Sequence, residues 1–183
     1  VEKLQEMADL TRNREEYKSA ISSLNKISFI YWDGGNPGRA IEYFLKAVPL
    51  NEKVDNIQNI KAIYSNIGLI YTDMEDLANA RTYFGKSLKI RRELGNKKEI
   101  TSGLIDLAYV EGLMGNYRDA NKHLSEALKI STSEEYPRMT VNIYNLLAKH
   151  YDKIGNIKKA KEYRKKYASY QEHLETQNLK RTY

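Results

Sequence analysis

The chain has 183 residues, of which 30 are basic, 24 are acidic and none is cysteine. This length suits one domain with a continuous core, and an apolar fraction of 41% argues against disorder. The sequence contains no apolar run of about 18 residues and no signal peptide, so we expect no membrane insertion in this fragment. Without cysteine there are no disulfides, thiolate metal sites or cysteine nucleophiles, and the compartment stays open. The net charge of +6 indicates at most a mild preference for acidic partners.

The sequence repeats itself at an offset of 40 residues. Self-similarity at a fixed period of this length is typical of helical-repeat proteins. Three registers carry the repeat through four units: Ile27, Ile67, Leu107 and Leu147; Tyr31, Tyr71, Glu111 and Tyr151; and Ala40, Ala80, Ala120 and Ala160.

Residues 1–20 precede the first complete unit. Their apolar residues share a register with the second half of that unit, since Leu4, Met7 and Leu10 stand 40 residues before Phe44, Ala47 and Leu50. We therefore expect this segment to be the end of a preceding repeat and its lead-in, and the chain to be a fragment of a longer protein. A natural capping helix is the alternative.

The four units that follow, near 21–60, 61–100, 101–140 and 141–180, are each predicted to be an antiparallel pair of helices. In the second unit, Tyr64, Ile67 and Tyr71 share one helical face, and residues 80, 84, 87 and 90 share another. Glycine with asparagine separates the two faces at 34–37, 115–116 and 155–156, and Glu-Asp does so at 75–76. The alanine register fits a close crossing of two helices. Residues 171–183 are expected to form a capping or exit helix.

The second unit resembles the tetratricopeptide repeat. Ile67-Gly68, Tyr71, Ala80, Phe84 and Ser87 stand where that family has its Leu-Gly, tyrosine, alanine, aromatic and small residue. Family units are commonly about 34 residues long, so this chain looks like the longer-unit type, similar to repeats in kinesin light chains and bacterial regulators with helical sensor domains. The resemblance implies an all-α, right-handed superhelical solenoid of about four repeats plus flanking helices, forming one domain. Glu111 departs from the pattern, because it replaces a core tyrosine, and is expected to loosen the third repeat.

The same resemblance implies that the first helix of each repeat lines a concave groove that binds a protein or peptide. Of the groove residues, Trp32 is the strongest candidate anchor; its alternative role is a partly buried packing residue at a helix end. The register of the family's groove selects Asn25, Phe29, Trp32, Asn66, Leu69, Asp73, Asp106, Tyr109, Asn145 and Lys149. The residues expected for a chaperone-binding carboxylate clamp are absent at most of its positions.

Catalytic and cofactor sites are not predicted. His123, His150 and His173 have no spacing suited to a metal site, and the glycine-rich segment 34–39 lacks the features of a phosphate loop and reads as a turn. Most of the fifteen tyrosines recur at repeat registers, which favours packing over stacking on nucleic-acid bases. The basic run at 158–166 is interpreted as a solvated face, with an acidic partner as the alternative.

The sequence therefore predicts a non-catalytic scaffold that binds a protein or peptide. We expect it to be the sensor or interaction domain of a larger regulatory protein, such as a bacterial sensor kinase or transcriptional regulator. A nucleic-acid-binding helical repeat and a free-standing adaptor are the alternatives. The sequence specifies neither the partner nor the oligomeric state.

Overall fold

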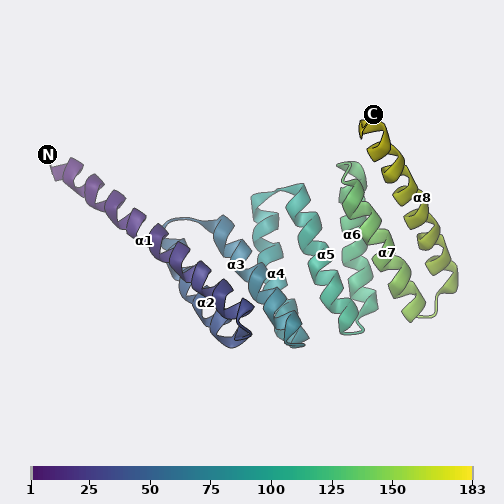
Figure 1. Cartoon of the computed structure of the whole chain (residues 1–183), viewed down its shortest axis with the longest axis horizontal. Coiled ribbons are helices and arrows are strands. Elements are labelled where there is room, and N and C mark those ends of the chain that lie inside the picture. The colour runs from purple at the N-terminus through teal and green to yellow at the C-terminus, as the bar shows by residue number, and fades with distance from the viewer. Residues whose placement is uncertain (1, 183) are drawn as a thin grey trace. The chain divides into compact units, whose positions relative to one another are not determined.

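The computed structural model describes the backbone of residues 2–182 and the side chains of residues 13–176. Within the described backbone the chain is all helix, without strands, which confirms the predicted all-α class. The side chains of Leu4, Met7 and Leu10, on which the lead-in prediction depended, lie outside the described residues. The helices are α1 (Glu2–Asp33), α2 (Pro37–Lys53), α3 (Ile57–Asp73), α4 (Leu77–Leu94), α5 (Lys97–Leu113), α6 (Tyr117–Ser133), α7 (Pro137–Lys153) and α8 (Ile157–Thr182) (Figure 1).

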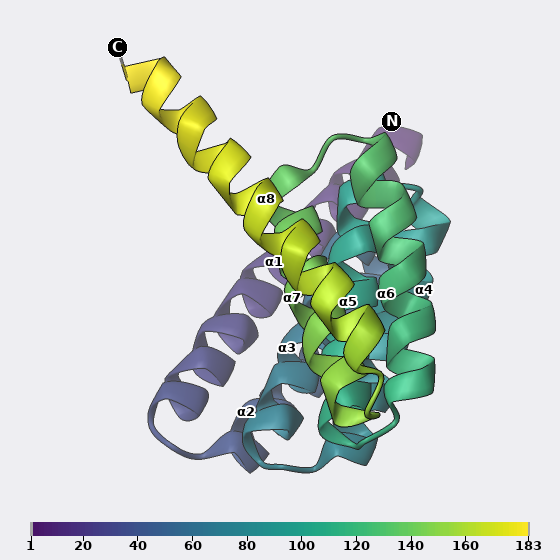
Figure 2. The same cartoon turned by 90° about the vertical axis from the view of Figure 1, so that its right-hand side faces the viewer.

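The helices fall into two compact units, Val1–Ile90 and Arg91–Tyr183, which are described separately. In the first unit α1 packs on α2 and α2 packs on α3. In the second unit α5 packs on α6, α6 on α7 and α7 on α8. Figures 1 and 2 show α7 and α8 as an antiparallel hairpin. Each unit is thus built from helical hairpins, the element that the 40-residue period predicts.

The segments at the two ends of the chain, residues 2–20 and 171–182, are both helical. Residues 2–33 form one uninterrupted helix, so the lead-in runs directly into the first helix of the first repeat. The tail at 171–182 continues α8 without a break. The assignment of residues 1–20 to a preceding repeat, and of the tail to a cap or exit helix, stays a prediction. Among the helices described, none has both the length and the apolar character required to cross a membrane.

Every turn between consecutive helices contains one residue with positive φ. Glycine occupies this position at Gly35, Gly95, Gly115 and Gly155, where φ is 74 to 78°. Non-glycine residues occupy it in the other three turns, at Asp55, Glu75 and Glu135. A left-handed residue after the last helical turn lets backbone N–H groups bond back to the final carbonyls, which ends the helix. In several of these turns an asparagine side chain then caps the next helix: Asn36 accepts a hydrogen bond from the Arg39 N–H at 3.3 Å, and Asn96 does the same for Glu99 at 3.1 Å.

The cores lie along the facing sides of the helices. Ala40, Ala80, Ala120 and Ala160, the alanine register, are all fully buried, as expected where two helices cross closely. In the first unit these alanines are joined by Phe44, Ile63, Ile67 and Ile70, and in the second unit by Leu104, Val110, Leu124, Ile143 and Leu147. This packing fixes which face of each first helix remains open to solvent.

Candidate functional site

One register of the first helices presents large side chains to solvent. Phe29 on α1, Leu69 on α3 and Tyr109 on α5 are separated by 40 residues each and have 43%, 45% and 49% of their surface exposed. Lys149 continues the register on α7 and is also exposed. Exposed apolar residues are common singly, but their recurrence at one repeat position is unusual for a face that needs only to be solvated. This register is part of the predicted groove.

In the first unit the predicted groove residues are in direct contact. The Phe29 and Trp32 rings stack with their centroids 6.3 Å apart, and the rings of Phe29 and the buried Phe44 pack at right angles with their centroids 5.3 Å apart. Trp32 donates its indole N–H to the Asp73 carboxylate at 3.2 Å, which links α1 to α3. Trp32 is half-buried and also packs against the first unit's core. The two roles predicted for Trp32 are therefore compatible, because one face of its ring is packed while its edge holds Asp73.

Two asparagines of the predicted groove have different surroundings. Asn25 donates to the side chain of Asn59 at 3.3 Å, and Asn59 donates to the buried Asn51 at 3.0 Å. The Asn25 amide oxygen is buried and has no hydrogen-bond partner among the described residues. Asn66 is half-buried. Asn25 therefore has a structural polar link to α3 that the groove prediction did not include.

The predicted residues of the second unit are more dispersed. Asp106 is half-buried, and its carboxylate lies 3.6 Å from the Arg91 guanidinium at the end of α4. Burial raises the pKa of Asp106, and the positive charge of Arg91 partly opposes this effect. Tyr109 and Lys149 are exposed and Asn145 is half-buried. Among the described residues of this unit, no hydrogen bond or ring contact joins these four side chains to one another.

The tyrosine registers form stacked pairs between the two helices of a repeat. Tyr31 stacks on Tyr43 and Tyr71 on Tyr83, with ring centroids 5.4 and 5.6 Å apart. Tyr151 stacks on Tyr163 at 5.6 Å. These contacts support the packing interpretation of the tyrosines over stacking on nucleic-acid bases.

The third repeat replaces this tyrosine pair with a polar pair. Glu111 is 5% exposed, and its carboxylate lies 2.8 Å from Nδ1 of His123. His123 occupies the register of Tyr43, Tyr83 and Tyr163. Both members of the stack have thus changed, and Glu111 has a polar partner in place of the second tyrosine. That Glu111 loosens the third repeat stays a prediction. Reading the 40-residue offset at His123 as well as at Glu111 would have revealed the pair.

A second histidine of this unit is buried. His150 is 6% exposed, and its Nδ1 lies 3.0 Å from the amide oxygen of Asn121 on α6. A methyl group at Gly112 would come within 2.5 Å of His150 Nε2, so the absence of a side chain there makes room for the imidazole. The register of His150 holds apolar residues in earlier repeats, namely Ile70 and Val110. Burial lowers the pKa of His150 from its ordinary value of 6.5.

We expect acid to weaken the second unit through His150. His150 is protonated below about pH 6.5 in the unfolded chain, but only at a lower pH in the folded chain. The free energy of unfolding therefore falls as the pH drops from 6.5 toward the lower folded pKa. Above pH 6.5 the contribution is fully present. A tenfold difference in proton affinity between the two states corresponds to about 1.4 kcal/mol. Urea denaturation followed by circular dichroism at pH 7.5 and 5.5 measures this loss.

His150→Val is the matched control, because Val110 fills the same register. The variant loses a hydrogen bond at every pH but removes the titrating group. Its stability should therefore decline less than that of the wild type between the two pH values. An equal decline in both proteins would contradict the assignment to His150.

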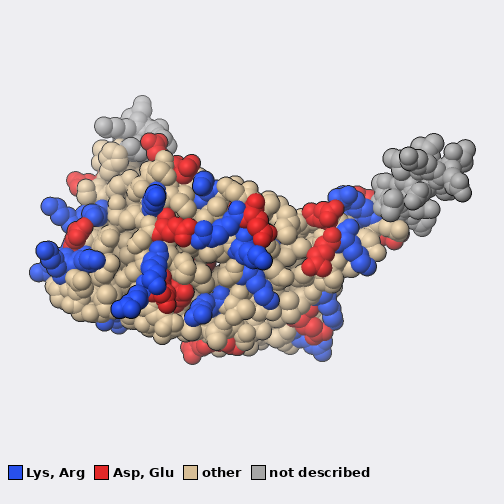
Figure 3. Space-filling view, turned by 180° about the vertical axis from the view of Figure 1, so that it is seen from behind, with Lys and Arg blue, Asp and Glu red and all other residues tan. Residues whose placement is uncertain are grey.

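The described surface has no cluster suited to a metal ion, since no group of three His, Cys, Asp or Glu side chains is arranged to hold one. Basic and acidic side chains are interspersed on the face of each unit seen in Figure 3. Nucleic-acid binding usually depends on a concentrated basic patch or stripe. The charge distribution on this face therefore does not favour the nucleic-acid alternative.

Comparison with known families identifies the repeat. Two tetratricopeptide-repeat family models match residues 59–133 and 21–54, which together make up more than half of the 183 residues. No curated protein sequence matches the chain. Repeats of this family are typically non-catalytic interaction modules.

Several solved structures share the fold. BtubC from P. vanneervenii superposes with a TM-score of 0.75 at 15% identity, covering 93% of this chain and 76% of that one. A STAND signal-transduction ATPase with a tetratricopeptide-repeat sensor, from Pyrococcus horikoshii, gives 0.76 at 24% identity, covering 88% of this chain and 25% of that one. The Rap conjugation gene regulator of plasmid pLS20, in complex with a Phr peptide, gives 0.60 at 18% identity and covers 80% and 41%. The chain thus spans well under half the length of the last two proteins, and identities this low show the fold alone.

Proposed function

Because the chain belongs to the tetratricopeptide-repeat family, we propose that it binds a protein or peptide through the first helices of its repeats. The observation that carries this proposal is the stack of the exposed Phe29 on the half-buried Trp32, whose indole N–H is bonded to Asp73 of the next first helix. A stacked aromatic pair offers a large and rigid apolar contact, and tryptophan is enriched among the residues that dominate binding energy. Leu69 of the same unit extends this register as a further apolar contact, and Tyr109 occupies the same register in the second unit.

Asp73 gives this surface a polar element beside its apolar one. It is the last residue of α3, and Asp33 is the last residue of α1. A carboxylate at a helix C-terminus is disfavoured by the helix dipole by about 0.3–1 kcal/mol, so neither is placed there for helix stability. Asp73 uses one oxygen to hold Trp32, which leaves the other free to accept from a ligand's backbone or side chain. We infer a ligand that combines an apolar side chain with a hydrogen-bond donor.

We further propose that the chain acts as the sensor or interaction region of a larger regulatory protein. Two structural neighbours support this reading: one is a signalling ATPase whose repeats are described as a sensor, and the other is a gene regulator with a bound peptide. In both cases the fold matches a portion of a longer protein.

The single tryptophan of the chain makes the proposal testable directly. Peptides selected from a phage-displayed dodecapeptide library should change the fluorescence of Trp32 when titrated into the protein. Their affinity should fall at least about 30-fold in Trp32→Ala, since truncation of an anchoring residue typically removes 2 kcal/mol or more. Binding to Trp32→Ala is followed by calorimetry, because that variant lacks the fluorophore.

Leu45→Ala is the control for this experiment. Leu45 lies on the second helix α2 and is 38% exposed, so it is a similarly accessible apolar residue outside the register. The Leu45→Ala variant should bind the selected peptides with the affinity of the wild type. If Trp32→Ala retains wild-type affinity, or if Leu45→Ala loses as much, the ligand surface is not the one proposed.

A further inference from the structure

A pocket in the second unit lies apart from the predicted groove residues, none of which lines it. Its volume is about 670 Å³, and it is lined by Arg118, Asn121, Lys122 and Ser125 of α6, by Tyr151 of α7 and by Ile154, which follows α7. Pockets that hold small ligands typically measure about 300–1,000 Å³. The pocket is therefore large enough for a short stretch of peptide.

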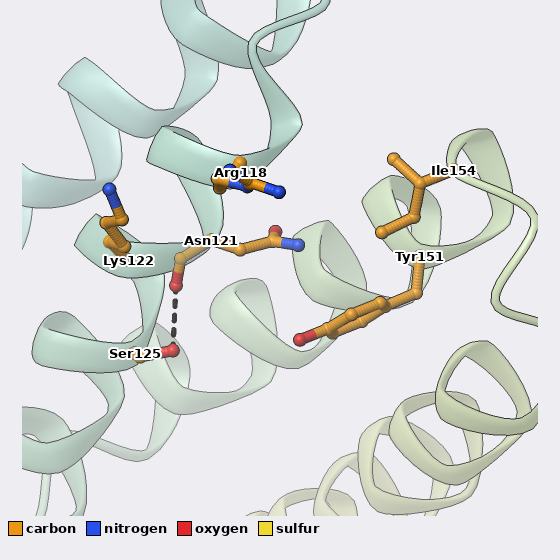
Figure 4. Close-up of a pocket in the computed structure, with 6 residues that line it drawn as sticks. All are labelled: Arg118, Asn121, Lys122, Ser125, Tyr151 and Ile154. Atoms are coloured by element: carbon orange, nitrogen blue, oxygen red, sulfur yellow. Dashed lines mark hydrogen bonds between the residues drawn. The ribbon is translucent and has the colours of Figure 1, made fainter.

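Hydrogen-bond donors converge on this pocket. Figure 4 shows the side chains of Arg118, Asn121 and Tyr151 directed toward the space between α6 and α7, whereas Lys122 points away from it. The Lys122 ammonium is paired with Asp119 at 2.9 Å. Arg118 is exposed; its charge acts on the Asp119 carboxylate, which Lys122 binds directly, and no salt bridge is formed by its guanidinium among the described residues. The guanidinium of Arg118 is thus available for a ligand.

The contacts of Asn121 direct its amide nitrogen to the pocket. Its amide oxygen lies 3.0 Å from Nδ1 of the buried His150. Because that oxygen can only accept, His150 donates from Nδ1 and Asn121 keeps both hydrogens of Nδ2 for another partner. Figure 4 shows this nitrogen on the side that faces Tyr151 and Ile154.

Tyr151 is oriented in a similar way. Its ring stacks flat on Tyr163 with centroids 5.6 Å apart, which fixes the direction of its hydroxyl. Lys159 donates to the hydroxyl oxygen from 3.4 Å. The hydroxyl hydrogen is consequently free to be donated into the pocket, and the Lys159 charge makes it a better donor.

Apolar surface borders these donors. Ile154 is 50% exposed at the edge of the pocket. No aspartate or glutamate is among the six lining residues. A site with three converging donors, one of them a guanidinium, and an apolar wall suits a carboxylate attached to an apolar neighbour.

The repeat offers an internal comparison for this site. Arg118, Asn121 and Lys122 can be compared with the residues at the same positions of earlier repeats. These are Ala78, Arg81 and Thr82 in the second repeat, and Gly38, Ile41 and Glu42 in the first. Tyr151 is replaced by Glu111 at the position 40 residues earlier. The repeat architecture therefore does not require this combination of donors, which is particular to the hairpin of α5 and α6 and the helix that follows.

We propose that this pocket binds an acidic segment of a partner protein. A glutamate or aspartate carboxylate sits between the Arg118 guanidinium, the Asn121 amide and the Tyr151 hydroxyl, and an adjacent apolar side chain packs on Ile154. Acidic residues lie among the basic ones on the face seen in Figure 3, which favours a peptide over nucleic acid. The site consists of residues other than those of the groove. An experiment that contradicts this site therefore leaves the proposed function untouched, and the reverse also holds.

The test uses the full chain and the hexapeptide acetyl-Gly-Leu-Glu-Glu-Leu-Gly-amide. Titration is followed by NMR through the Asn121 side-chain amide signals, with calorimetry for the affinity. Binding should shift these signals, and Arg118→Gln should weaken it at least about tenfold, because a hydrogen bond to a charged group contributes about 1.5–3 kcal/mol. Tyr151→Phe keeps the ring stack and removes only the hydroxyl, and it should weaken binding by a smaller factor.

Four controls separate the proposal from its alternatives. Arg138→Gln removes another exposed arginine of the same unit, on α7, and should leave the affinity unchanged. The peptide with glutamine in place of glutamate should not bind. Equal losses in Arg118→Gln and Arg138→Gln, or no shift at Asn121, would overturn the site. Equal affinity for glutarate would assign the pocket to free carboxylates, and tighter binding of a uridine decanucleotide would assign it to nucleic acid; either result overturns the peptide proposal.

Discussion

Replacing Phe84 by alanine should destabilise the first unit by about 3–5 kcal/mol, because deletion of a buried aromatic ring removes its apolar contacts and leaves a cavity. Phe84 on α4 is 3% exposed. Its ring lies so close to α3 that a methyl group built at Gly68 would be 2.9 Å from the ring carbons. The free energy of unfolding of a small domain is about 5–15 kcal/mol, so this loss is a large part of the total stability.

The measurement is urea denaturation followed by the fluorescence of Trp32, which lies in the first unit and is the only tryptophan. Phe29→Ala is the matched control, because Phe29 is 43% exposed and its removal should lower stability by about 1 kcal/mol. Similar losses for both variants would mean that Phe84 does not hold the two helices together as its burial indicates.

Much of the fold could be predicted from the sequence because the same type of residue recurs at the same position of each repeat, where the packing imposes the same requirement. The alanine register Ala40, Ala80, Ala120 and Ala160 marks the close helix crossings, and all four side chains are fully buried. The Gly-Asn pairs at 115–116 and 155–156 mark turns, and both glycines have the positive φ that ends a helix. A position that repeats with one residue type reveals its environment even when a single occurrence is ambiguous.

The candidate sites could be predicted only where a register carries them. Phe29, Leu69 and Tyr109 share one position, so their common exposure follows from the helical period. The link from Trp32 to Asp73 does not follow from it, because the hydrogen bond depends on side-chain orientation across two helices.

The pocket on α6 was missed for a related reason. Two of its donors, Arg118 and Asn121, stand on α6 and the third, Tyr151, on α7, and Arg118 and Asn121 break the register instead of repeating it. Departures from the repeat, read in pairs across neighbouring helices, are the signal that could have located both this pocket and the pair formed by Glu111 and His123.

That pair leads to the second large effect, since His123→Ala should destabilise the second unit by about 3 kcal/mol. Glu111 is 5% exposed, and removing its partner leaves a buried carboxylate without the group that satisfies it. Far-UV circular dichroism reports on both units and Trp32 fluorescence only on the first. Urea curves by the two methods should therefore separate, with the second unit unfolding at lower urea.

The double variant Glu111→Tyr, His123→Tyr should recover the stability lost in His123→Ala and reach or exceed that of the wild type. A buried polar pair can often be replaced by well-packed apolar groups without loss, and the first repeat contains the needed arrangement. There Tyr31 stacks on Tyr43 with Leu24 packed against the same core, and Leu104 stands at the register of Leu24 in the third repeat. If the double variant is as unstable as His123→Ala, the polar pair is fitted to surroundings in the third repeat that differ from those of the first. Full recovery would show that the repeat tolerates either pair, so that its stability does not require the polar one.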